Sequence, residues 1–280
     1  MNMKNWFATS PPNVDASPSD ALAKRVRKFQ NGFARRHREQ YHDLVRHGQK
    51  PTRLFISCAD SRIIPDALTG SKPGENFSVR VVGNIVPPYD LQRPDAAVGS
   101  AIEYSIKVLG IEEVIVCGHS HCGACAALMT GQGKHLTLAH RWLEHGLPVR
   151  RAIESQIESG GRSLSQLLSN HASRDEVFRA AERAMVVQQV RNLRSYPFVD
   201  ELVASGDLRL RGWYYEIESG QVDQYDGRSL SFVPVAEAPT ARAARHDQSA
   251  VTVVQEHGQA EASRPKSDPV VTATKLVRAS

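Results

Sequence analysis

The chain lacks any run of eighteen or more apolar residues, which is the length that a helix needs to cross a bilayer. Its first fifteen residues contain a single lysine and no continuous apolar segment, so they do not read as a secretory signal. These absences predict a protein of the cytoplasm with no membrane partner.

Cysteine is scarce, with only four in 280 residues, and all of them lie in the first half of the chain. In a reducing compartment, thiols grouped in this way favour metal binding or simple burial over disulfide formation. We therefore expect no disulfide framework.

The formal charge of +5 could indicate an acidic partner. However, the basic residues concentrate in 24–53, where apolar residues recur at helical spacing. A charge run of this kind is usually the solvated face of a helix, and no stacking aromatics or nucleic-acid motif accompany it. We predict no nucleic-acid partner.

Composition divides the chain into four parts. Segment 1–16 is rich in Ser, Pro and Asn and is predicted to be disordered. Segment 17–48 is predicted to be a helical arm, capped at Ser19 or Asp20 and ended by Gly48. The sequence predicts a folded domain over 49–233 and a disordered tail over 234–280, because large apolar residues become rare there.

Hydrophobic periodicity within the folded domain alternates between strand and helix patterns. This order predicts an α/β fold with a central, mostly parallel sheet flanked by helices, since strand-helix-strand units form parallel pairs. A hairpin is expected around Ser219-Gly220. The expected strands are 52–59, 76–82, 112–117, 208–216 and 221–225, and the expected helices are 96–109, 123–130, 137–144, 148–157 and 174–193.

Chemistry-bearing residues follow the first and third predicted strands. Cys58 ends the first strand, whereas His119 and Cys122 follow the third. Parallel neighbours bring their carboxyl ends to one edge of a sheet, so these side chains should meet. A lone buried cysteine is more often a small hydrophobe, but two thiolates and an imidazole are donors that suit zinc. Three protein ligands leave a fourth position open, as in catalytic zinc sites.

The pattern Cys-x-Asp-x-Arg, followed by His-x-x-Cys-Gly, resembles the zinc signature of the β-class carbonic anhydrases. The resemblance extends from about Gln49 to Asp226 and is closest to the plant and cyanobacterial branch. Further matching segments are Pro73-Gly74-Glu75, Gly83-Asn84-Ile85-Val86-Pro87-Pro88-Tyr89, Ile102-Glu103-Tyr104, Tyr196-Pro197-Phe198 and Gly212-Trp213-Tyr214-Tyr215.

This resemblance implies a carbonic anhydrase with one zinc ion per chain, bound by Cys58, His119 and Cys122. The reaction would be reversible hydration of carbon dioxide to bicarbonate and a proton, by attack of a zinc-bound hydroxide. Asp60 and Arg62 would form a dyad that orients the zinc-bound water, with Arg62 keeping Asp60 ionised. On a strand end, residues 58, 60 and 62 can project to the same side, so Asp60 can lie beside the zinc-bound water while Arg62 pairs with it.

The resemblance also implies a small substrate pocket. Its expected lining is Gln49, Phe77, Val82, Tyr104 and Gly123. Val81 departs from the family pattern, which often has Asn there, and so alters the expected pocket wall. Candidates for the proton relay to solvent are His121, Tyr89 and the buffer itself.

The family resemblance implies a homodimer or a dimer of dimers, in which the arm packs on a partner subunit and Tyr104 reaches across the interface. Two other readings stay open. The same site could act on a related heterocumulene such as carbon disulfide or carbonyl sulfide. Alternatively, the tail could recruit a protein partner, so that the chain acts as a scaffold.

Overall fold

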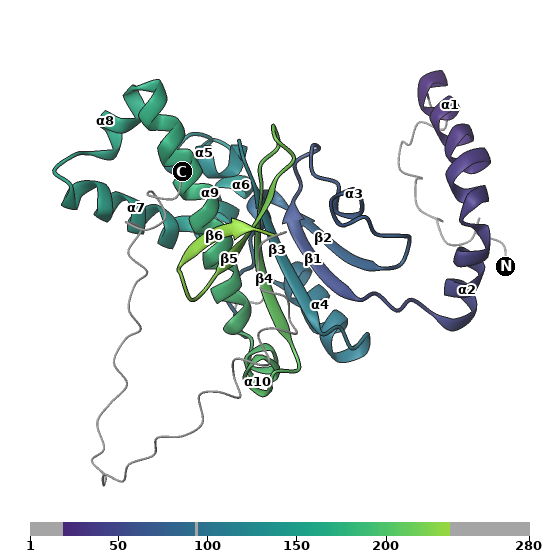
Figure 1. Cartoon of the computed structure of the whole chain (residues 1–280). Helices are drawn as coiled ribbons and strands as arrows, with labels where there is room; N and C mark the ends of the chain where they lie inside the picture. The colour runs from purple at the N-terminus through teal and green to yellow at the C-terminus, as the bar shows by residue number, and fades with distance from the viewer. Residues whose placement is uncertain (1–18, 93–94, 236–280) are drawn as a thin grey trace, which may run out of the picture. The chain divides into compact units, whose positions relative to one another are not determined.

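The computed structural model describes residues 19–92 and 95–235 (Figure 1). The disorder predicted for 1–16 and for the tail beyond residue 235 lies outside these residues. The chain divides into two compact units, Met1–Gln49 and Lys50–Ser280. Within the described residues, no helix is both long and apolar enough to cross a membrane.

The described part of the first unit is helical, as predicted. Ser19 caps the first helix by accepting the N–H of Leu22, and Gly48 ends the last helix with a φ of +78°. Within this arm the α-helix widens into a π-helical turn and breaks at His37, whose backbone is not helical. The elements are α1 (Asp20–Phe29), η2 (Gln30–Ala34) and α2 (Arg38–His47).

The second unit is built on a six-stranded sheet with the order β2-β1-β3-β4-β5-β6. The first four strands in this order pair in parallel, whereas β5 and β6 join antiparallel at one edge. The predicted α/β class with a mostly parallel sheet is therefore confirmed. The strands are β1 (Arg53–Cys58), β2 (Asn76–Val81), β3 (Glu113–His119), β4 (Arg209–Tyr215), β5 (Val222–Asp226) and β6 (Ser231–Pro234).

The second unit also contains eight described helices, and α9 packs against the sheet. The helices are α3 (Pro65–Thr69), α4 (Ala96–Glu103), α5 (Gly123–Thr130), α6 (Thr137–Leu143), α7 (Leu147–Ser159), α8 (Leu164–Ser169), α9 (His171–Arg194) and α10 (Pro197–Ser205), with short turns η3 (Val82–Asn84), η4 (Tyr104–Val108) and η5 (Glu144–Gly146). The sequence prediction missed α3, α8, α10 and β6.

Helix α9 lies along β3 and β4 (Figure 1). The approach is close because two strand positions carry no side chain. A Cβ atom at Gly118 would lie 2.5 Å from Cγ2 of Val186, and one at Gly212 would lie 2.9 Å from Cγ1 of the same residue. Glycine at both positions therefore allows α9 to pack closely against β3 and β4.

The central strands β1 and β3 are buried on both faces, which explains their continuous apolar runs. On one face, Leu54 and Val114 pack with Ile102 of α4. On the other face, Phe55, Ile115 and Cys117 form a separate buried cluster. Burial on both sides fixes the ends of these two strands, where the predicted site residues lie.

Candidate metal centre and its surroundings

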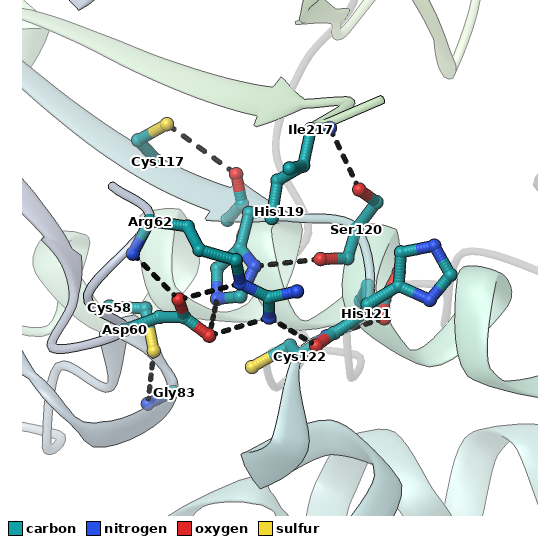
Figure 2. Close-up of polar contacts among 12 residues, drawn as sticks. Cys58, Asp60, Arg62, Gly83, Cys117, His119, Ser120, His121, Cys122 and Ile217 are labelled. Carbon is teal, nitrogen blue, oxygen red and sulfur yellow. Dashed lines mark hydrogen bonds and ion pairs between the residues drawn. The ribbon is translucent and has the colours of Figure 1, made fainter. Parts of the chain in front are cut away.

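Three predicted zinc ligands meet at the carboxyl ends of β1 and β3 (Figure 2). Cys58 ends β1, His119 ends β3, and Cys122 is the N-cap residue of α5. The two strands are parallel neighbours. The two Sγ atoms and a ring nitrogen of His119 all lie within 4.8 Å of one another, and all three residues are buried.

The histidine is oriented for a metal. Nδ1 of His119 lies 2.8 Å from the carbonyl oxygen of Ser120, to which it can only donate. This bond places the proton on Nδ1 and leaves a lone pair on Nε2. Nε2 is buried and has no hydrogen-bond partner among the described residues. A buried lone pair facing two thiols is a donor set that fits zinc.

The thiols also need a cation. The hydrogen bond with Cys122, together with burial, raises the pKa of Cys58 to about 12. The N–H of Gly83 points at Cys58 Sγ from 3.4 Å and favours the thiolate. A metal ion deprotonates a coordinating thiol outright. A bound dication would therefore stabilise the thiolates of Cys58 and Cys122 in this buried position.

Asp60 and Arg62 lie in a turn after β1 and do not continue the strand. The expected alternation of residues 58, 60 and 62 along a strand is therefore wrong, although the pairing of the dyad is as expected. Arg62 donates from Nε to Oδ1 of Asp60 at 2.9 Å and from Nη2 to Oδ2 at 2.7 Å. Its backbone N–H also donates to Oδ1, at 3.0 Å. The turn thus closes on its own carboxylate.

This pairing keeps Asp60 ionised beside the ligand cluster. The hydrogen bonds from Arg62 hold the pKa of Asp60 well below its usual range. Oδ2 of Asp60 lies 3.9 Å from Nε2 of His119. Arg62 makes one further bond, from Nη2 to the carbonyl oxygen of His121 at 3.0 Å, and so links the turn to the ligand-bearing loop (Figure 2).

Comparison with known proteins decides the family. The family model described as "Carbonic anhydrase" matches residues 53–222. A carbonic anhydrase of the cyanobacterium Synechocystis sp. is 36% identical over 79% of this chain and 74% of that protein. The chain belongs to the β-carbonic anhydrase family. This membership confirms the family and the class of enzyme predicted from the sequence.

Solved structures of the family have the same fold. The β-carbonic anhydrase CcaA matches with a TM-score of 0.67 and 36% identity, over 78% of this chain and 100% of that chain. A second match comes from a study of two tetrameric β-carbonic anhydrases of the ascomycete Sordaria macrospora. It has a TM-score of 0.59 and 25% identity, and it covers 73% of this chain and 94% of that chain. Oligomers thus occur among the carbonic anhydrases that this chain resembles.

The predicted pocket residues are only partly brought together. The ring centroids of Phe77 and Tyr104 lie 6.1 Å apart, and Gly123 directly follows the predicted ligand Cys122. Val82 precedes the glycine that contacts Cys58 and is 45% exposed, while Tyr104 is 44% exposed. Gln49 belongs to the first unit, so its expected place in the pocket stays a prediction.

The two side chains among the candidates for the proton relay have different surroundings. His121 is half-exposed, and its Nε2 lies 2.5 Å from Oε1 of Glu218 and 2.7 Å from Nη2 of Arg179. Tyr89 packs its ring against Tyr196, with the ring centroids 5.2 Å apart. His121, Tyr89 and the buffer itself all stay candidates for the proton relay.

Sequence reasoning missed a buried carboxylate next to the site. Glu182 of α9 is 2% exposed and accepts a hydrogen bond from the N–H of Cys122. One signal was available, because Glu182 interrupts the apolar face that Ala181, Met185 and Val186 form at helical spacing. A charged residue on the buried face of a helix needs a partner.

Proposed function

We propose that this chain is a zinc-dependent carbonic anhydrase that hydrates carbon dioxide reversibly to bicarbonate and a proton. The observation that carries the proposal is the buried trio Cys58, His119 and Cys122, in which Nε2 of the histidine has no partner among the described residues. An ionised carboxylate, Asp60, lies directly beside it. Family membership supports the same reaction.

Cys58, His119 and Cys122 would hold one zinc ion per chain. Bound there, zinc would supply a Lewis acid with an open fourth position, where it lowers the pKa of a water molecule toward neutrality. The chain supplies the rest of the site. Nδ1 of His119 fixes the ring on the carbonyl of Ser120, and the N–H of Gly83 stabilises the charge on Cys58.

Asp60 would accept a hydrogen bond from the activated water and so orient its lone pair toward carbon dioxide. Arg62 donates hydrogen bonds to both oxygens of this carboxylate. These bonds keep Asp60 ionised as a hydrogen-bond acceptor and restrain it from binding the metal. The lowered pKa of Asp60 means that it stays ionised at the pH of the reaction. Asp60 and Arg62 are therefore the proposed catalytic dyad.

Carbon dioxide is small and apolar, so its site should be lined by apolar groups. We assign this lining to Phe77, Val82, Tyr104 and Gly123, and Gln49 stays a predicted polar contributor. The exposure of Val82 and Tyr104 supports a pocket completed by a second chain. Assembly as a homodimer or a dimer of dimers would supply it, and light scattering on the purified protein would measure the mass.

Two further predictions concern the setting of the enzyme. A cytoplasmic location agrees with the lack of a membrane-spanning helix among the described residues, and it stays a prediction. A protein partner bound by the tail over 234–280 also stays a prediction. Truncation after Pro234 that leaves the activity, the oligomer mass and the cellular position unchanged would reject it.

The deciding experiment is stopped-flow hydration of carbon dioxide by the wild type, Asp60→Asn and Asp200→Asn, with zinc measured in each sample. Asp200 is a matched control, because it is half-exposed and pairs with Arg194 on the surface. We expect activity in the wild type and the control, and a large loss in Asp60→Asn at unchanged zinc. A fully zinc-loaded wild type that does not accelerate hydration would refute the proposal.

A further inference from the structure

Glu182 has no part in the mechanism above, yet both of its carboxylate oxygens accept hydrogen bonds. Oε1 accepts the N–H of Cys122 at 2.9 Å. Oε2 accepts Nη1 of Arg179 at 2.8 Å and the hydroxyl of Tyr214 at 2.9 Å. Oε1 therefore binds the loop that carries Cys122, whereas Oε2 binds Arg179, which neutralises the carboxylate, and Tyr214.

The peptide between His121 and Cys122 is held at both of its polar atoms. Its carbonyl oxygen accepts from Arg62, and its N–H donates to Glu182. A peptide unit has its positive end at the N–H and its negative end at the carbonyl. The carboxylate and the guanidinium therefore face the ends of opposite charge, which stabilises a single orientation of this peptide.

The loop needs such an anchor. His121 has a φ of +56°, in the left-handed region that a residue with a side chain rarely adopts. A conformation of this kind persists where the surrounding bonds determine it. Rotation of the peptide would move Cys122, which follows it, and would remove the carbonyl on which Arg62 rests.

We propose that Glu182 is a positioning residue of the metal centre, which fixes the peptide between His121 and Cys122 and thereby sets the place of the Cys122 sulfur and of Arg62. The inference rests on the proposed zinc site. Glu182 would affect more than the ligand Cys122, because Arg62 in turn donates two side-chain hydrogen bonds to Asp60. One buried carboxylate on α9 thus orients a metal ligand and, through Arg62, the catalytic dyad.

The experiment measures the metal directly. Wild type, Glu182→Gln, Tyr214→Phe and Glu113→Gln are loaded with zinc to measure its release to a chelator, and with cobalt(II) to record the visible spectrum. Tyr214→Phe removes one bond to Oε2 and leaves Oε1 on Cys122. Glu113 is a control, because this ion-paired carboxylate begins β3 at the strand end remote from His119.

We expect Glu182→Gln to release zinc roughly ten- to a hundredfold faster than the wild type, because changing residues that orient metal ligands weakens metal affinity by about this factor. Its cobalt spectrum should shift, because the thiolate of Cys122 is displaced. Tyr214→Phe should have a smaller effect, and Glu113→Gln should match the wild type in both readouts. If Glu182→Gln does not fold, Glu182→Asp replaces it, since the shorter side chain cannot reach both sets of partners.

Release at the wild-type rate with an unchanged cobalt spectrum would overturn the inference, and so would an equal effect of Glu113→Gln. These readouts are independent of hydration activity. A wild type that binds cobalt but does not hydrate carbon dioxide would contradict the proposed reaction, while Glu182 would still be judged by metal release. A wild type that binds neither metal would overturn both.

Discussion

Arg80 of β2 donates from Nη2 to the carbonyl oxygen of Asp60 at 2.6 Å. Its Nε also lies 3.4 Å from the carbonyl oxygen of Cys58. The turn that bears the dyad is therefore held through its backbone by Arg80 and through its carboxylate by Arg62. A neighbouring strand thus contributes to the geometry of the proposed catalytic pair.

Arg80→Ala should lower the rate of carbon dioxide hydration about tenfold at unchanged zinc content, because a hydrogen bond from a charged group contributes about 1.5–3 kcal/mol. Stopped-flow kinetics would measure the loss. Arg53→Ala is the control, since Arg53 lies at the start of β1 and bonds Ser71 and Asn76. Equal losses in the two variants would show that Arg80 acts only on stability.

Zinc content should distinguish Cys122, the N-cap residue of α5, from Cys125 in its first turn. Cys122→Ser should lose most of the bound zinc, and Cys125→Ser should retain about one zinc per chain, because only Cys122 belongs to the ligand trio. Both residues are buried, so general destabilisation would affect both. Metal analysis after gel filtration measures the outcome, and loss of zinc from both variants would contradict the assignment.

Removing zinc from the wild type with a chelator should lower its thermal midpoint.

Close packing between α9 and β3 makes Gly118 intolerant of a methyl group. Gly118→Ala should lower the free energy of unfolding by about 1–3 kcal/mol, because its Cβ would lie 2.5 Å from Cγ2 of Val186. Val186→Ala removes that obstacle at the cost of a cavity. In urea unfolding, the double variant should therefore be more stable than the sum of the single effects predicts. Strict additivity would show that the helix shifts freely.

Tyr196 should make stability depend on alkaline pH. Its hydroxyl donates to the carbonyl of Pro87 at 3.1 Å, and burial raises its pKa to about 12. The unfolded phenol ionises near pH 10, at about its ordinary pKa. Between these values the unfolded state binds fewer protons than the folded state, so stability falls as pH rises.

Tyr196→Phe lacks this dependence. At pH 8 the variant should be less stable than the wild type by about 1 kcal/mol, for the lost hydrogen bond. At pH 11 the gap should shrink by about 1 kcal/mol, because one shifted pKa unit is worth about 1.4 kcal/mol. Urea unfolding at both pH values measures the gap, and a gap that does not change with pH would refute the argument.

Much of the fold follows from local pattern. Helix α5 begins at Gly123 and ends at Thr130 as predicted, and the apolar runs of β1 and β3 predicted their places in the sheet. Short elements escaped, because six residues of α8 or four of β6 are too few to establish a periodicity. Their formation depends on caps and tertiary contacts, such as the capping box of Ser163 and Gln166.

The site divides in the same way. Cys58, Asp60 and Arg62 fall within one short motif, so their proximity could be predicted. Arg80 and Glu182 could not be assigned, because their partners lie on other elements and each resembles an ordinary strand or helix residue. The turn geometry of the dyad was also missed, since it depends on a side-chain bond to the backbone.

The proposed ligands come from distant parts of the chain. Helix α3, strand β2 and helix α4 lie between Cys58 and β3, the strand that ends at His119. A metal ion bound by all three would close this long loop in the manner of a cross-link, which restricts the unfolded ensemble. Since proteases act on the transiently opened chain, metal supply would govern the lifetime of the protein in the cell as well as its turnover of substrate.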